Sequence, residues 1–393
     1  MNRAGNLYVD IAEPENLRLA FLKAIRGKRG KPDVIVYTAR LEENLRVLRD
    51  QLLAHKVDVG HYHFFTVHDP KERVICAASF PERVLHHAIM NVCEPVLERY
   101  AIHDSYACRT GKGMHAAVLR AQDFTRQFPW YLKLDVRKYF DTIDHKTLLA
   151  LLERRFKDRE LLDLFAVILA TYQSGTDDAE VVPPEDEIGG SPSLPAPRSA
   201  RQAGVATGIR KDGTEPVPPE EGVEGRPPCR PAFSSGRGLP IGNLLSQHMA
   251  NFYLGHLDHR IKETLRVHGY VRYMDDFVLW AHDKAMLTAH LAAVRGFTES
   301  DLMLTLKDNV QINRCARGIP FLGYRIFSRR LALGPRARRR FARKLRGYEQ
   351  EWLSGQWSEA DLQRHMEALL SYVRFADTRG LRKRIVAESS LAA

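Results

Sequence analysis

The chain has few cysteines and no long apolar run, and both absences limit what it can be. Its 393 residues include no CxxC pair, and the five cysteines are Cys76, Cys93, Cys108, Cys229 and Cys315. This argues against a disulfide framework or a cysteine zinc site, and it is typical of a reducing cytoplasm. No apolar stretch approaches the roughly 18 residues of a membrane span, and the N-terminus is polar. We therefore expect no membrane segment, no signal peptide and a cytoplasmic location.

A complete phosphate loop is also missing. The stretch SYACRTGKGMHAAVLR at 105–120 contains GKG ahead of a predicted helix, but the pattern GxxxxGK[ST] is absent. The sequence therefore does not predict a P-loop nucleotide site. Arg109 and Lys112 are instead predicted to contact a nucleic-acid backbone.

Acidic residues are outnumbered by basic ones. The chain has 59 Lys and Arg against 48 Asp and Glu, a net charge of +11 and a pI of about 9.4. A basic excess of this size points to a polyanion partner, most often nucleic acid. Between Arg325 and Arg346 there are ten basic residues and no acidic one. Much of this stretch is predicted helical and suits the backbone of a duplex; a solvated basic surface is the alternative.

The sequence divides into three predicted parts. Residues 1–60 form a helical extension, because segments such as Leu41–His55 carry apolar residues at three- and four-residue spacing. Residues 61–328 form the main unit, and residues 329–393 form a basic helical one. The main unit is interrupted at 174–235, which contains 11 of the 20 prolines. This composition predicts a largely disordered insertion.

Two adjacent carboxylates stand in the middle of an apolar stretch. Val271–Trp280 reads VRYMDDFVLW, which predicts a β-hairpin with Asp275 and Asp276 at its tip. A second predicted strand, Tyr131–Val136, ends near Asp135. Carboxylates at adjoining strand ends are what a two-metal site requires. A solvated Asp-Asp turn, and a capping role for Asp135, are the alternatives.

Two further stretches favour contact with a phosphorylated ligand. Residues 62–75 predict two short strands around a turn, with Lys71 and Arg73 side by side, and such cations neutralise triphosphate oxygens. Residues 236–260 begin with a glycine loop, in which Gly242 allows close backbone approach, and continue as a helix.

Four strings, in this order, resemble the motifs of reverse transcriptases: LDVRKYFD, GLPIGNLLSQ, YMDD and FLGY. The resemblance covers nearly the whole chain apart from the Pro-rich insertion. Within that superfamily the chain is most similar to the reverse transcriptases of diversity-generating retroelements, on the strings DPKERVICAASFPERVLHHA, SYACRTGKG, IGNLLSQ and SYVRFADT. The resemblance implies an α/β (α+β) right-hand polymerase. Its fingers and palm would combine an antiparallel sheet with helices, followed by a C-terminal helical thumb.

The resemblance also implies roles for individual residues. The implied catalytic residues are Asp135, Asp275 and Asp276. The implied ligands of two Mg²⁺ ions, with Mn²⁺ as a substitute, are Asp135, Val136, Asp275 and Asp276. The implied dNTP-binding residues are Lys71, Arg73, Tyr139, Phe140, Ile241, Gly242 and Lys307. The implied primer or template contacts are Arg109, Lys112, Tyr273, Met274, Phe321, Leu322, Gly323 and Tyr324. Phe140 would be the steric gate that excludes a ribose 2′-hydroxyl.

The implied activity is RNA-directed DNA synthesis, which makes error-prone cDNA from a template RNA for mutagenic retrohoming of a diversity-generating retroelement. The implied partners are the template RNA, the cDNA primer or product, dNTPs and a basic oligomeric accessory variability protein. Ile241 stands where most reverse transcriptases have a Gln that can hydrogen-bond the substrate, and losing such a contact relaxes discrimination. Two alternatives stay open: a related reverse transcriptase in phage defence, and a non-catalytic RNA-binding scaffold. The intact aspartates and Phe140 argue against the scaffold.

Overall fold

The computed structural model describes residues 3–67, 73–172, 174 and 236–387. The helices are α1 (Tyr8–Ala12), α2 (Pro14–Ala24), α3 (Pro32–Ala39), α4 (Leu41–Leu53), α5 (Phe80–Tyr100), α6 (Met114–Gln127), α7 (Tyr139–Thr142), α8 (His145–Glu153), α9 (Arg159–Ala170), α10 (Leu244–His259), α11 (Lys284–Ser300), α12 (Pro335–Leu353), α13 (Glu359–Arg374) and α14 (Arg379–Ala387), with short helical turns η1 (Arg260–Thr264) and η2 (Cys315–Arg317). The strands are β1 (Tyr62–Val67), β2 (Arg73–Ala78), β3 (Trp130–Asp135), β4 (Gly269–Tyr273), β5 (Asp276–Ala281), β6 (Gln311–Arg314), β7 (Ile319–Phe321), β8 (Tyr324–Ile326) and β9 (Leu331–Leu333). None of these helices is both long and apolar enough to cross a membrane.

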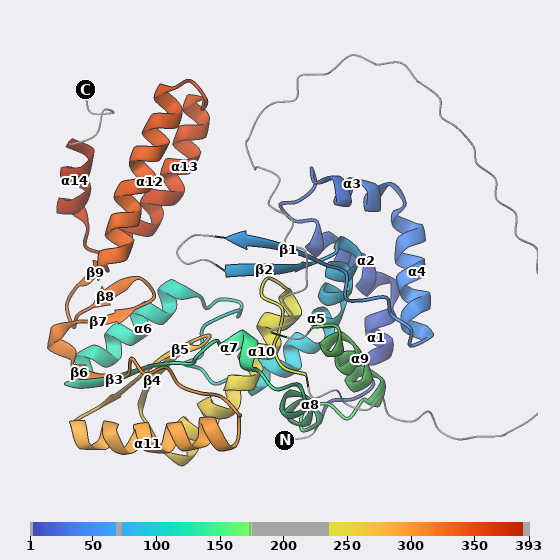
Figure 1. Cartoon of the computed structure of the whole chain (residues 1–393), viewed down its shortest axis with the longest axis horizontal. Coiled ribbons are helices and arrows are strands. Elements are labelled where there is room, and N and C mark those ends of the chain that lie inside the picture. The colour runs from blue at the N-terminus through green and yellow to red at the C-terminus, as the bar shows by residue number, and fades with distance from the viewer. Residues whose placement is uncertain (1–2, 68–72, 173, 175–235, 388–393) are drawn as a thin grey trace, which may run out of the picture.

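A four-stranded antiparallel sheet lies at the centre of the fold. Its strand order is β4-β5-β3-β6, and the pairing of β3 with β5 places Asp135 opposite Asp276. Successive side chains of a strand point to opposite faces, so Leu134 packs in one core and Tyr131 in another. Figure 1 shows α11 along one face of this sheet and α6 along the other.

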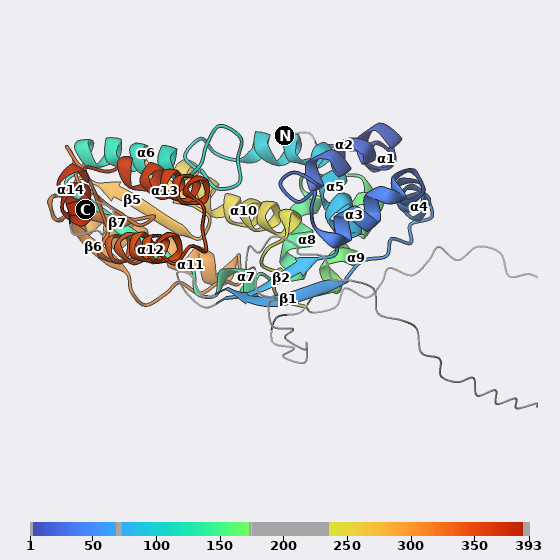
Figure 2. The same ribbon diagram turned by 90° about the horizontal axis from the view of Figure 1, so that it is seen from above.

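Two hydrophobic cores meet at this sheet. One joins the face that carries Leu134 and Phe277 to α10, α11 and the N-terminal helices. The other joins the face that carries Tyr131 and Trp280 to α6, the β7-β8-β9 sheet and α12. In Figure 2, α1–α4 lie at one end of the molecule and α12–α14 at the other, with α10 between them. Because β3 and β5 contribute to both cores, their ends are held from both sides.

Local sequence patterns explain most of the elements. The spacing of Leu45, Leu48 and Leu52 buries one stripe of α4, which confirms the predicted helix. Asp144 caps α8, because its carboxylate accepts a hydrogen bond of 2.8 Å from Thr147 N in the first turn of that helix. The two strands predicted within 62–75 pair as β1-β2, the hairpin predicted for Val271–Trp280 is present as β4-β5, and a further antiparallel pair is β7-β8.

Two short strands have no counterpart in the predicted pattern. β6 pairs with β3, and β9 pairs with β8 inside the basic run that was predicted helical. Neither strand shows an alternating pattern in the sequence, because each has only three or four residues. Each forms by pairing with an existing strand, β3 for β6 and β8 for β9. The basic helix α12 begins only at Pro335, which occupies the first helical position.

The mixed helical and antiparallel-sheet architecture confirms the α+β class. Of the predicted insertion at 174–235, the structure describes only Ser174, and residues 175–235 lie outside the described part of the chain. The predicted domain boundaries stay predictions.

Candidate active site

The predicted hairpin of Val271–Trp280 is confirmed, and its tip is a two-residue turn. Tyr273 and Asp276 are the last paired residues of β4 and β5, so Met274 and Asp275 form the turn. Met274 has a φ of 55°, and a positive φ in a two-residue loop matches the twist of the flanking strands. A residue with a long side chain seldom adopts this conformation unless its surroundings hold it there.

A buried ion pair supports the turn from below. The guanidinium of Arg272 donates hydrogen bonds of 2.7 and 2.5 Å to the carboxylate of Asp258 on α10. The same guanidinium donates to Met274 O at 3.0 Å and to Asn251 Oδ1 at 2.8 Å. Arg272 and Asp258 are 1% and 0% exposed. The turn that carries Asp275 is thus tied to the helix under the sheet.

Each of two predicted catalytic carboxylates is paired with a lysine. Lys307 Nζ lies 2.6 Å from Asp135 Oδ1, and Lys307 N donates to Asp135 O at 2.8 Å. Lys133, two residues before Asp135 on β3, forms an ion pair with Asp276 through its Nζ and Oδ1 of the aspartate. Lys307 was among the predicted residues, and Lys133 was not. The alternation of a strand could have identified it, since Lys133 and Asp135 share a face.

Burial and mutual repulsion perturb the aspartates. Burial raises the pKa of Asp276 to about 6, against the opposing charge of Lys133. Burial, and then the charge of Asp135, raise the pKa of Asp275, while Lys307 and Arg73 act in the opposite direction. The structure therefore brings three predicted aspartates and two predicted cations within electrostatic reach of one another.

The arrangement fits a divalent cation in its chemistry. Carboxylate oxygens are the ligands that Mg²⁺ prefers, and the repulsion between Asp135 and Asp275 is what a cation would relieve. Within the described ranges, no three His, Cys, Asp or Glu side chains are grouped as a metal site. In this structure Asp135 and Asp276 each bond a lysine instead, so a cation bound here would take the place of these lysine contacts. Val136, the fourth predicted ligand, is fully buried. Its backbone forms an isolated antiparallel β-bridge with Leu306.

The predicted gate residue borders the glycine loop. Phe140 is half-buried, and its carbonyl accepts a hydrogen bond of 2.8 Å from Leu239 N. Its neighbour Tyr139 is buried, with the hydroxyl donating to Ala250 O. The side chain of Tyr139 is thus engaged in the core, and only Phe140 of this pair has an exposed part.

The loop from Leu239 to Asn243 docks on strand β2. Cys76 N donates to Ile241 O at 2.8 Å, which extends the backbone pairing of β2 onto the loop. Gly242 has a φ of 117°, and a Cβ there would lie 2.8 Å from Ile75 Cγ2. Both facts require glycine at this position. The exposed Arg73 begins β2, whereas Lys71 lies outside the described residues.

Two predicted nucleic-acid contacts have intramolecular partners. Arg109 forms a bidentate pair with Glu98, at 2.6–2.9 Å, and donates to Ile102 O and Ser105 O. These bonds use the guanidinium to hold its own loop. Lys112 Nζ donates to His103 O at 2.9 Å. A nucleic-acid contact at either residue stays a prediction.

The FLGY stretch forms the turn between β7 and β8. Leu322 and Gly323 have φ angles of 48° and 84°, and the flanking Phe321 and Tyr324 are buried. Lys133 Nζ lies 5.8 Å from the centre of the Phe321 ring, so this turn is near the aspartates. The hydroxyl of Tyr324 donates a hydrogen bond of 3.1 Å to Tyr372 O on α13, which joins the turn to the C-terminal helices.

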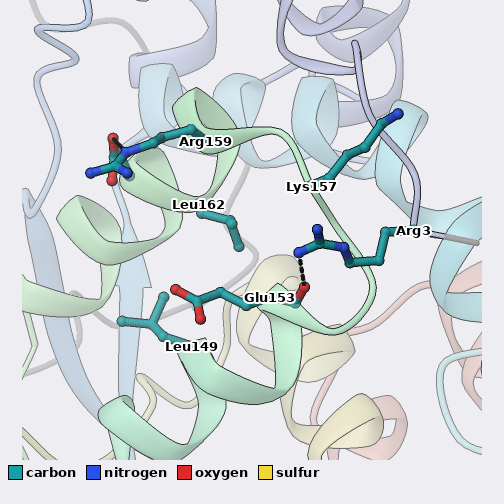
Figure 3. A pocket seen from close by; sticks show the side chains of 7 residues that line it. Arg3, Leu149, Glu153, Lys157, Arg159 and Leu162 are labelled. Carbon is teal, nitrogen blue, oxygen red and sulfur yellow. Dashed lines mark hydrogen bonds and ion pairs between the residues drawn. The ribbon is translucent and has the colours of Figure 1, made fainter.

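A separate pocket of about 260 Å³ lies between α8 and α9. Figure 3 shows its mixed lining, with the guanidinium of Arg3 bonded to Glu153 O beside Leu149 and Leu162. None of the aspartates described above lines it.

Comparison with known proteins finds distant relatives. No family model matches the chain. It is 24% identical over 337 residues to Protein YkfC of Escherichia coli, which covers 75% of this chain and 74% of that one. It is 25% identical over 88 residues to the putative COX1/OXI3 intron 2 protein of Saccharomyces cerevisiae, and 27% identical over 85 residues to nuclear intron maturase 1, mitochondrial, of Arabidopsis thaliana. Each of these two matches covers 22% of this chain, but only 10% and 12% of the relative.

These matches support a reverse-transcriptase-like family. Among solved structures, the chain is similar to telomerase from Candida albicans in complex with a TWJ fragment of telomeric RNA. The identity is 12% and the TM-score 0.40, with coverage of 86% of this chain and 58% of the telomerase chain.

Proposed function

We propose that the protein is an RNA-directed DNA polymerase. The observation that carries the proposal is that Asp135 and Asp275 lie at adjoining strand ends. The positive charges of Lys307 and Arg73 also lie within electrostatic reach of the Asp275 carboxylate. Acidic groups that hold divalent ions, surrounded by cations that neutralise phosphate, are what nucleotidyl transfer requires. The similarity to one intron protein and one intron maturase supports the same reaction class.

In this proposal Asp135, Asp275 and the backbone of Val136 would hold two Mg²⁺ ions, with Asp276 beside them. The ions supply activation of the primer hydroxyl and charge neutralisation at the leaving pyrophosphate. Arg73 and Lys307 hold triphosphate oxygens, and Lys307 exchanges its bond to Asp135 for one to phosphate. Phe140 excludes a ribose 2′-hydroxyl by its bulk.

The finer proposal is that the enzyme copies a template RNA with frequent errors for a diversity-generating retroelement, together with a basic accessory protein. The resemblance supports it, because Ile241 takes the position where most reverse transcriptases have a Gln that can hydrogen-bond the substrate. The backbone of Ile241 is fixed to β2 by the bond from Cys76 N. An apolar side chain on a well-positioned loop reduces discrimination without disturbing the loop.

The deciding experiment is primer extension on an RNA template with Mg²⁺ and dNTPs, using the full chain with its cognate RNA and accessory protein. Asp275→Asn and Asp276→Asn should each lower synthesis at least a hundredfold. Asp283→Asn is the matched control, because Asp283 caps α11 next to the same strand and Asn caps equally well. Full synthesis by the Asp275→Asn, Asp276→Asn double variant would refute the proposal.

Sequencing the products tests the finer proposal. Errors should concentrate opposite template adenines, and Ile241→Gln should reduce them several-fold with little loss of synthesis. Accurate synthesis by the unmodified chain would retain the polymerase and exclude the diversifying role.

A further inference from the structure

The turn between α2 and α3 is basic and is held in a defined backbone conformation. Residues 25–32 read IRGKRGKP. Lys28 N donates a hydrogen bond of 2.9 Å to Ile25 O, and Lys31 N donates one of 3.0 Å to Lys28 O. Gly27 has a φ of 72°, and a Cβ placed there would meet nothing within 4 Å. The cations of this turn are therefore presented on a fixed backbone beside open space.

One face of α5 lies against the end of α2 and adds a further cation. Arg83, His87 and Asn91 follow one another at four-residue spacing, which places them on the same face of the helix. Lys23, in the last turn of α2, donates a hydrogen bond of 2.6 Å from its Nζ to Asn91 Oδ1. Arg83 and His87 are half-buried, whereas Lys23 is exposed. This face of α5 therefore continues the basic surface of the turn.

The cations of this surface lie close enough to repel one another. Burial lowers the pKa of Lys28, the charge of Arg83 acts in the same direction, and Asp33 acts against them. Burial also lowers the pKa of His87 to about 4, and the charges of Lys23 and Lys28 add to that effect. The imidazole is therefore neutral at pH 7, and the positive charge comes from three side chains, which we call the basic cluster: Lys23, Lys28 and Arg83.

The basic cluster differs from other cations of this part of the fold in its lack of carboxylate partners. Arg18 on α2 pairs with Glu42 at 2.6 Å, and Arg109 pairs with Glu98 at the same distance. Within the part of the chain that the structure describes, no ion pair involves a member of the basic cluster. Like charges that are held together disfavour one another and raise the local concentration of anions. The cluster therefore favours the binding of an anion.

The extent of the cluster indicates a row of phosphates. Arg83 and Asn91, the contact of Lys23, are eight residues apart on α5, which corresponds to about 12 Å along a helix. Successive nucleotides of one strand rise by about 3.4 Å, so this length matches roughly three or four phosphates and exceeds a single one. Lys and Arg are the side chains that most often neutralise a nucleic-acid backbone.

The cluster lies at the opposite end of β2 from the aspartates. Arg73 begins β2, and its charge acts on Asp275. Ala78 ends β2, and its carbonyl accepts a hydrogen bond of 2.8 Å from Arg83 Nε. The five steps between these ends of the strand span about 17 Å, at roughly 3.3 Å each. A nucleic-acid strand that follows β2 away from the aspartates therefore reaches the cluster after about five nucleotides.

We propose that the basic cluster binds the sugar-phosphate backbone of the single-stranded template RNA ahead of the site of synthesis. The assignment to the template rests on the proposed function, whereas the binding of an RNA strand does not. Backbone contacts carry no sequence information, so the cluster holds templates of any sequence. The N-terminal helices are then part of the RNA-binding surface as well as a packing element.

The affinity of the full chain for primer–template duplexes tests the proposal without any need for activity. Two duplexes differ only in the 5′ overhang of the RNA template, which is about two nucleotides long in one and about twelve in the other, so only the longer overhang reaches the cluster. The variant Lys23→Gln, Lys28→Gln, Arg83→Gln should bind the longer duplex about tenfold more weakly and the shorter one as the wild type does. For the longer duplex, the slope of log K against log salt should become shallower by about two, since each phosphate contact with a single strand contributes about 0.7.

A second triple variant is the matched control. Arg154→Gln, Lys157→Gln, Arg159→Gln removes the same net charge from exposed positions at the ends of α8 and α9. It should bind both duplexes as the wild type does. Equal weakening by the two triple variants would show an effect of net charge alone and would overturn the proposal.

The remaining outcomes also decide the question. If the cluster variant fails to fold, Lys23→Gln, Lys28→Gln keeps the Arg83 bond to β2 and should still weaken the longer duplex several-fold, whereas Lys23→Arg, Lys28→Arg should bind normally. Equal weakening of both duplexes, or unchanged affinity for the longer one, would overturn the proposal and leave the cluster to another anion, such as an acidic protein. If the dependence on the overhang holds and the chain makes no DNA, the proposed function fails while the RNA site stands.

Discussion

Arg272 and Asp258 form a fully buried ion pair, and the same guanidinium hydrogen-bonds the carbonyl of Met274 in the turn that presents Asp275. A buried charge is tolerable only with its partner, since removing one member of such a pair costs about 3–5 kcal/mol. The pair therefore couples the stability of the fold to the geometry of the candidate site.

Arg272→Met should lower the free energy of unfolding by about 3–5 kcal/mol, because Asp258 is left buried and unpaired. Denaturant unfolding measures this free energy. Arg295→Met is the control, because Arg295 is exposed. The double variant Arg272→Met, Asp258→Leu should recover part of the loss. A double variant as unstable as the sum of the single ones would contradict the coupling.

Lys133→Met should lower primer extension about tenfold, because Asp276 loses a charge-assisted hydrogen bond worth roughly 1.5–3 kcal/mol. The Mg²⁺ concentration that gives half-maximal extension should shift as well. Lys133→Arg should retain part of the activity, since it keeps the charge. An unchanged Mg²⁺ dependence in Lys133→Met would show that Lys133 does not influence the metal-dependent step.

Asp275→Asn should stabilise the protein in EDTA, because it removes a buried charge that Asp135 repels. In the wild type, millimolar Mg²⁺ should raise the Tm, since a ligand that binds only the folded state stabilises it. The variant should lose this Mg²⁺ response. A full Tm response in the variant would exclude Asp275 as a ligand.

Gly242→Ala should destabilise the protein by roughly 1–3 kcal/mol and raise the dNTP KM, because an L side chain is strained at a φ of 117° and contacts Ile75. Ile75→Ala should relieve only the contact, so the double variant recovers part of the loss. Gly296→Ala in α11 is the control: nothing lies within 4 Å of its Cβ, and the change should be neutral or stabilising. A wild-type melting curve for Gly242→Ala would contradict the docking of the loop.

Acid should destabilise the fold through its buried histidines. Burial lowers the pKa of His86 and of His256 to about 3, against an ordinary value of 6.5 in the unfolded chain. Below pH 6.5 the unfolded state therefore binds more protons, and the free energy of unfolding falls as the pH drops toward 3. His256→Asn should reduce this loss by roughly 3 kcal/mol between pH 7 and 4. The free energy of unfolding would be measured against pH for the wild type and for His256→Asn, and equal pH slopes for the two proteins would contradict the prediction.

Much of the candidate site could be predicted from local pattern. Alternating apolar residues around Asp275 and Asp276 require a hairpin with the carboxylates at its tip, and the apolar run before Asp135 requires a strand that ends there. Glycine at 242 signalled a backbone conformation that few other residues adopt. These are consequences of periodicity and φ, and they need no distant contact.

Lys133, Arg272 and Asp258 show the limit of that reading. Each is a charged residue inside an apolar element, and its partner lies on another element: Lys133 is 143 residues from Asp276, and Arg272 on β4 is 14 residues from Asp258 on α10. Arg109 shows the converse, since a basic residue in a loop suggested a ligand contact and the fold pairs it with Glu98. No local pattern distinguishes a charge that meets a ligand from one that meets another side chain.

The amino-acid sequence by itself determined the secondary structure around the aspartates, the basic C-terminal helix and the resemblance to reverse transcriptases, because these depend on residues close together in the chain. Only the tertiary structure decided which charges face one another: Lys307 with Asp135, Lys133 with Asp276, and Arg272 with Asp258. The reason is physical, since the energies of buried charges and polar atoms depend on distance and desolvation, and both are set only when distant segments pack together.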